Sequence, residues 1–195
     1  DPDYTYNEGS GSGITVDATD DRAEHTVTTR VSARVSDAAA PTGTQEIILD
    51  GNNVAATDNS LHVLTRCATS GADLRNLYIG EFEDSIANEV SLFRQDNGVG
   101  TSLITGDRSL AGAATRRYRL RAIGGGARVA LEYQIDDTRP VIVTDTSANR
   151  KVSGNPGFGF ANVASALNWA DKLSIEDLAA TGCMARCGTV TIGTG

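Results

Sequence analysis

The segment RRYRLRAIGGGARVALEYQIDDTRPVIV (residues 116–143) contains two alternating runs that meet at three consecutive glycines. Alternation of apolar and polar residues is typical of a strand with one buried and one wet face. A turn at Gly125 and Gly126 places Tyr118 opposite Tyr133. The same register pairs Leu120 with Leu131 and Ala122 with Val129, and on the polar face Arg117 with Gln134, Arg119 with Glu132 and Arg121 with Ala130. A slip of one residue would bury the arginines, so the sequence predicts an antiparallel hairpin with defined faces.

Further short strand-like runs follow one another along the chain, separated by turn residues. HTVTTRVSARV (25–35) alternates like one long two-faced strand, and Asp96-Asn97-Gly98 predicts a tight turn because Asn and Gly accept positive φ. Only residues 85–88 and 164–168 are compatible with helix. The pattern predicts one all-β, antiparallel two-sheet sandwich. The other expected strands are 14–17, 45–53, 61–68, 74–82, 89–95, 101–105, 141–144, 157–163 and 173–178.

The composition narrows the classes of partner. The chain has 195 residues and a formal net charge of −8, which argues against a nucleic-acid groove. No apolar run approaches the roughly 20 residues of a membrane helix, and the start has no signal-peptide pattern. We therefore expect no membrane insertion. The recognition and surface functions considered below imply a place outside the cell or on a cell or particle surface. The first residue is Asp, which suggests a processed product or an excised segment.

The two ends differ in composition from the middle. Residues 1–13 read as a polar arm, residues 14–180 as the sandwich domain, and residues 181–195 as a tail with one further strand at 189–192. That strand has no evident partner within the domain, and an unpaired strand invites addition to a neighbour's sheet. The tails therefore predict a homo-oligomer or a larger assembly.

Four segments carry a resemblance to a known superfamily. VSLFRQDNGVGTSLIT (90–105), the hairpin segment, GNPGFGFANV (154–163) and KLSIEDL (172–178) resemble the back half of a concanavalin A-like lectin/glucanase domain of the laminin-G-like type. The resemblance covers about residues 16–178. It implies an antiparallel jelly-roll sandwich, a fold that hosts many functions.

The enzymes of that superfamily carry alternating carboxylates, Glu-x-Asp-x-Glu, on one strand. The nearest segment here places Glu81 and Glu83 on one face but has Ser85 where a third carboxylate would stand. No Gly-x-Ser-x-Gly elbow is present, and the two histidines, His25 and His62, are isolated. We therefore expect no catalytic residues, with a polysaccharide lyase or glycosidase of unfamiliar site as the remote alternative.

Calcium is the one cofactor that the resemblance suggests, because jelly-roll lectins often hold it in rim loops. Oxygen ligands for this cation are available at Asp17, Asp20 and Asp21, or at Asp136 and Asp137. Asp is also an ordinary residue of tight turns, which is the competing interpretation.

Glycan contact would need an aromatic platform with polar neighbours. Trp169 is the only tryptophan, and Asn168 and Asp171 lie beside it. Such a group can stack on a sugar and bond its hydroxyls. Tyr78 is a second aromatic candidate. A role in the core or at its edge is the alternative for both rings.

A row of arginines, Arg117, Arg119 and Arg121 with Arg128 nearby, offers an anion-binding stripe for sulfate or carboxylate groups. In the expected register Glu132 neutralises part of it. A solvated face or a subunit contact is therefore the competing interpretation.

The chain has three cysteines, an odd number. Cys183 and Cys187 lie close enough in sequence for a local disulfide in an oxidising compartment, and an intermolecular disulfide or free thiols are the alternatives. A zinc site is disfavoured because further ligands are distant in sequence.

Three functions are consistent with these observations. The first is a non-catalytic recognition or adhesion module for a glycan or glycoprotein. The second is a structural component of a surface or virion, such as a phage decoration or tail protein, that assembles through its tails. The third is the lyase or glycosidase.

Overall fold

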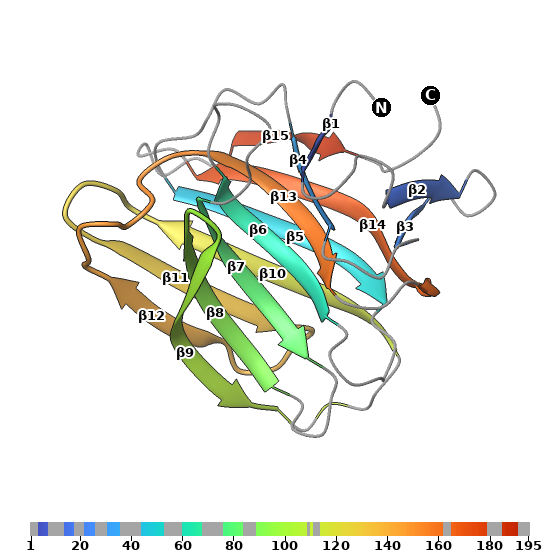
Figure 1. Cartoon of the computed structure of the whole chain (residues 1–195), viewed down its shortest axis with the longest axis horizontal. Coiled ribbons are helices and arrows are strands. Elements are labelled where there is room, and N and C mark those ends of the chain that lie inside the picture. Colours follow the sequence, from blue (N-terminus) through green and yellow to red (C-terminus); the bar gives the residue numbers. More distant parts are fainter. Residues whose placement is uncertain are drawn as a thin grey trace.

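The computed structural model describes residues 4–7, 14–17, 22–25, 31–35, 44–52, 60–67, 76–83, 89–108, 110, 114–161, 165–178 and 185–190. These residues form two antiparallel sheets packed face to face (Figure 1). None of the described residues is helical, so this part of the chain contains no helix that is able to span a membrane.

The seven strands of the first sheet lie in the order β1 (Tyr4–Asn7), β4 (Val31–Val35), β13 (Asn155–Ala161), β6 (Ser60–Cys67), β7 (Leu77–Glu83), β8 (Glu89–Asp96) and β9 (Val99–Asp107). The second sheet has the order β12 (Val141–Asp145), β11 (Val129–Ile135), β10 (Thr115–Ile123), β5 (Thr44–Asn52), β14 (Ser165–Leu178), β3 (Arg22–His25) and β2 (Ile14–Asp17), and β15 (Ala185–Val190) also pairs with β14.

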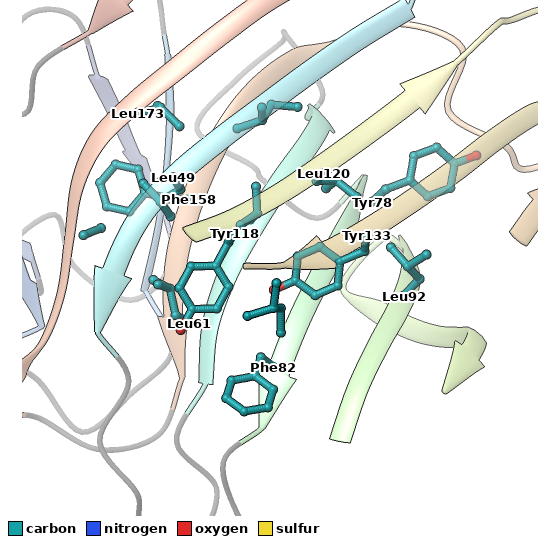
Figure 2. Close-up of a cluster of buried hydrophobic side chains, with 14 of the residues drawn as sticks. Leu49, Leu61, Tyr78, Phe82, Leu92, Tyr118, Leu120, Tyr133, Phe158 and Leu173 are labelled. Carbon is teal, nitrogen blue, oxygen red and sulfur yellow. The ribbon is translucent and has the colours of Figure 1, made fainter. Parts of the chain in front are cut away.

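The main core lies between the two sheets. Alternate residues of β10 and β11 are buried, because a pleated strand sends successive side chains to opposite faces. Tyr118 and Tyr133 from these strands meet Leu61, Phe82 and other side chains of the first sheet (Figure 2). Burial of each large apolar side chain contributes about 1.5–3 kcal/mol, so this layer is the main source of stability.

The β10–β11 hairpin has the predicted faces but not the predicted pairs. Tyr118 lies opposite Ile135, and Tyr133 lies opposite Leu120. The turn is centred between Gly126 and Ala127, one residue later than expected, and this moves every pair by two residues. Because side chains repeat with period two, a shift of two leaves both faces unchanged.

The prediction of one long strand at residues 25–35 was wrong. β3 ends at His25 and belongs to the second sheet, whereas β4 begins at Val31 and belongs to the first. The alternation in the sequence continues across the region, so the pattern does not show where the chain leaves one sheet for the other. The prediction that residues 164–168 are compatible with helix was also wrong, since residues 165–168 begin β14.

Both ends of the chain contribute strands to the sandwich. Tyr4–Asn7, expected in a polar arm, forms β1 and pairs with β4. β15, expected without a partner, pairs with β14 through residues such as Leu173 and Val190. The expectation that the C-terminal strand has no partner within the domain was therefore wrong, and assembly through the tails stays a prediction.

Candidate functional site

The outer face of the second sheet brings together two sets of residues that are far apart in sequence. Ala170 of β14 and Tyr118 of β10 point into the core, so their neighbours Trp169 and Arg117 point outward. Trp169 lies opposite Asn52 of β5, and Asp171 lies opposite Asp50. Asp50 in turn lies opposite Arg117. The tryptophan and arginine candidates therefore share one face, with β5 between them.

Trp169 is half-buried and has a charged neighbour. The Arg22 guanidinium of β3 lies 5.3 Å from the centre of the Trp169 ring, within the range of a cation–π contact. Arg22 Nε and Nη2 both donate to Glu24 Oε1, at 3.0 and 2.9 Å. Sequence reasoning missed Arg22 and Glu24, because only the long-range pairing of β3 with β14 brings them to Trp169.

The arginine row is paired with carboxylates. Arg117 Nε and Nη2 donate to the two oxygens of Asp50, at 2.8 and 3.0 Å, and these bonds raise the pKa of Arg117. Arg121 Nε donates to Glu46 Oε1 at 2.5 Å. Glu132, expected opposite Arg119, lies opposite Arg121 instead, as the shifted register requires.

Arg119, the middle member of the row, has polar neighbours on both adjacent strands. Its Nη1 donates to Gln134 Oε1 at 3.2 Å, and its Nε lies 3.5 Å from Glu46 Oε1. The row is therefore a network of ion pairs and hydrogen bonds along the outer face rather than a stripe of bare cations.

A depression of about 350 Å³, which we name the β10 pocket, lies where this face reaches the rim. Arg116 Nη1 donates to Asp136 Oδ2 at 3.0 Å, and the Arg117 backbone N–H donates to Asp136 Oδ1 at 2.8 Å. Asp136 has φ of 50° in the turn after β11, an angle that Asp tolerates better than most residues. The pocket is lined by Asp50, Thr115, Arg116, Arg117, Arg119, Asp136 and Asp137.

Tyr78 is not a surface ligand contact. Its side chain is fully buried, and its hydroxyl donates to Asp145 Oδ2 at 2.8 Å while it accepts from the Lys151 backbone N–H at 3.0 Å. Burial raises the pKa of Tyr78. The prediction that Tyr78 contacts a glycan was wrong, because the ring fills the core between β7 and β12.

Arg128 is exposed but lies at the far end of the hairpin from the β10 pocket. It lines a second depression of about 360 Å³, together with Ile123, Gly124, Gly125, Ala130 and Thr144. The side chain of Asn168 lies outside the described part of the structure. Of the predicted ligand residues, the outer face thus brings together Trp169, Asp171, Arg117, Arg119 and Arg121.

The predicted calcium ligands have different positions. Asp20, Asp21 and the side chain of Asp17 lie outside the described residues. The Asp136 carboxylate accepts from Arg116 and from the Arg117 backbone, and Asp137 is exposed beside it. Among the described residues no group of three or more His, Cys, Asp or Glu side chains is arranged to hold a metal ion.

The remaining sequence candidates lie elsewhere. Cys183 and the side chain of Cys187 are outside the described residues, so the expected disulfide stays a prediction. Glu81 lies on the first sheet, with its Oε1 3.3 Å from His62 Nε2 on the adjacent strand. Glu83, on the same strand, lies opposite Glu89.

Comparison with known proteins gives structural but not sequence relatives. No protein-family model matches the chain, and no curated protein matches it in sequence. A carbohydrate-binding module from Bacillus subtilis matches with a TM-score of 0.55 and 13% identity, over 86% of this chain and 90% of that one. Winged bean acidic lectin, solved with methyl-α-D-galactose, matches with a TM-score of 0.54 and 8% identity, over 87% and 92%.

The enzymatically active domain of tailspike protein 2 from bacteriophage CBA120 matches with a TM-score of 0.50 and 11% identity. The match covers 89% of this chain but only 28% of the tailspike chain. At these identities the comparisons establish the fold alone. The chain has the antiparallel jelly-roll fold of the concanavalin A-like lectins, which confirms the fold that the sequence resemblance implied.

Proposed function

We propose that the chain is a non-catalytic carbohydrate-binding module whose ligand binds the outer face of the second sheet, between Trp169 and the β10 pocket. The observation that carries the proposal is the register of β10, β5 and β14, which places an aromatic ring beside arginine–carboxylate pairs and a depression. The carbohydrate-binding module and the galactoside-bound lectin among the similar structures support this class of ligand.

The chemistry of the face suits a sugar. A sugar hydroxyl both donates and accepts hydrogen bonds, so a guanidinium donor next to a carboxylate acceptor satisfies both capacities. Arg117 and Asp50 form such a pair, and the Arg117 side chain is 61% exposed. An aromatic ring such as Trp169 packs against the apolar C–H face of a pyranose. The pocket volume lies within the usual range for small-ligand sites.

A glycan array followed by titration calorimetry tests the proposal. The wild-type chain should bind at least one glycan, and Trp169→Ala and Asp50→Ala should each weaken that binding at least about tenfold. Thr101→Ala changes an exposed residue of β9 in the other sheet and serves as the matched control. A blank array with folded protein, or equal affinity in all three variants, would refute the proposed site.

The second candidate is a structural component of a particle, exposed at its surface. The supporting observation is that a bacteriophage tailspike contains a domain of similar fold. The matched part is less than a third of the tailspike chain. β1 and β15 pair within the chain, and in this candidate these ends of the chain also contact neighbouring copies. Sedimentation equilibrium tests this candidate, and a monomer across a hundredfold range of concentration would remove it.

An enzymatic function is disfavoured by the missing third carboxylate, although the similar tailspike domain is enzymatically active. We expect neither reducing ends nor unsaturated sugars to be released from a polysaccharide panel. If the wild-type chain releases such products and the Glu81→Gln variant does not, the non-catalytic proposal is overturned and the first sheet is the active face.

A further inference from the structure

The arginines of the β10 pocket suggest an anionic ligand when they are considered alone, but their partners argue against it. Three arginines and three aspartates line the pocket, so the formal charges of its side chains cancel. Asp171 on the neighbouring strand and Glu46 beside Arg119 add further negative charge to the same face. The whole chain carries a net charge of −8.

Two of the three guanidinium groups bind an aspartate directly. Asp50 holds Arg117 through two parallel hydrogen bonds, the strongest geometry for this pair of groups. Asp136 holds Arg116, whose side chain is only 8% exposed. A sulfate or carboxylate would have to replace these aspartates as the arginine ligand while the displaced aspartates stay close by. Like charges at such distances disfavour binding.

An uncharged hydroxyl-rich ligand meets no such conflict. The bonds from Arg117 to Asp50 use Nε and one N–H of Nη2, and a guanidinium has five N–H groups. The outward N–H groups of this exposed side chain can donate to one hydroxyl, while an Asp50 or Asp137 oxygen accepts from the next. Thr115, also exposed, adds a hydroxyl that donates or accepts.

We infer that the β10 pocket selects uncharged sugars with adjacent hydroxyls over sulfated or uronic-acid sugars, with Asp50 and Arg117 as the recognition pair. The inference rests on the proposed function, because it assigns a ligand class to the same site. Affinity should therefore depend little on salt, since no net charge is neutralised when the ligand binds.

The experiment compares dextran with dextran sulfate, alongside the neutral and acidic members of a glycan array, at 50 and 500 mM NaCl. Wild-type protein should bind neutral glycans with affinities that differ less than about twofold between the two salt concentrations. Asp50→Asn removes the charge with almost no change in size. It should weaken neutral binding about tenfold and introduce salt-sensitive binding of dextran sulfate.

Two further variants complete the experiment. Asp137→Asn changes an exposed pocket residue, so it makes the same test with little risk to folding, and dextran sulfate binding should again increase. Glu132→Gln is the matched control, because it removes a carboxylate from the same face outside the pocket. Wild-type binding confined to sulfated or acidic glycans would overturn the inference and leave the proposed function standing. A blank array would overturn the proposed function itself.

Discussion

The ring of Tyr133 in β11 lies directly against Gly80 of β7, across the interior of the sandwich. A Cβ added at residue 80 would lie 2.7 Å from Tyr133 Cδ2 and 2.8 Å from Cε2, closer than real contacts of this kind. Tyr133 is fully buried, and burial raises its pKa well above the ordinary value. Glycine at position 80 is therefore what allows the ring to fit between the sheets (Figure 2 shows the ring in the core).

Gly80→Ala should destabilise the chain by about 1–3 kcal/mol, because the ring or the backbone must shift in a filled core. Gly100→Ala is the control, since a Cβ there meets nothing within 4 Å. Equilibrium denaturation in urea measures the free energy of unfolding of both variants. Equal stability of the two variants would contradict the contact between Tyr133 and Gly80.

The burial of Tyr133 could be predicted from the sequence, but its neighbours could not. Alternation places Tyr118 and Tyr133 on the apolar face, and the structure buries both. Their cross-strand partners depend on where three successive glycines turn, and glycine accepts the required angles at each position. Gly124 and Gly126 both have positive φ, and the register of the two strands places the turn one residue later than expected.

The same limit applies to the candidate site. The sequence identified Trp169 and the arginines separately but gave no reason to combine them. Only the pairing of β14 with β5, and of β5 with β10, places them on one face. Such non-local pairing depends on how the whole sheet is assembled rather than on any local pattern. The fold class was predictable because strand periodicity is local.

Stability should fall in acid because of the carboxylates of Asp145 and Asp96. Burial by itself raises the pKa of Asp145, but hydrogen bonds from Ser147, Tyr78 and Arg94 outweigh it and lower the pKa on balance. Burial by itself also raises the pKa of Asp96, but hydrogen bonds from Lys151 and Arg94 outweigh it and lower the pKa on balance. A pKa lower in the folded than in the unfolded state contributes stability that is present above the unfolded value of about 4.

That contribution is lost as the pH falls through the folded pKa values, so the free energy of unfolding should decrease steadily from about pH 5 toward pH 2. Asp145→Asn should lower the free energy of unfolding by about 3 kcal/mol at pH 7, because Arg94 loses a buried partner. The same variant should show a smaller decrease in the free energy of unfolding between about pH 5 and pH 2. Asp107→Asn alters an exposed carboxylate and is the control. Urea denaturation from pH 2 to 7 provides the curves, and parallel curves for the wild type and Asp145→Asn would contradict the assignment.

Removal of residues 185–195 should destabilise the sandwich rather than dissociate an oligomer. β15 covers the edge of β14 from Leu173 to Asp177, and its loss would expose unpaired backbone groups there. We expect a lower melting temperature and a larger mass by light scattering, as the exposed edge pairs between chains. Deletion of residues 191–195 alone keeps β15 and is the control. A stable, smaller species after the longer deletion would instead support assembly through the tail.

The fluorescence of Trp169 should change when the ligand binds, and the signal comes from one residue because this is the only tryptophan in the chain. The ring is half-buried beneath Arg22, so Arg22→Gln should shift its emission to the red by admitting water. Thr115 of the β10 pocket, Asn52 and Trp169 lie in one cross-strand row, so a glycan that extends from the pocket along this row reaches the ring. Its addition should shift the emission to the blue in a saturable way, with the Kd that calorimetry gives. Binding measured by calorimetry with no change in emission would place the ligand away from Trp169, on another surface of the molecule.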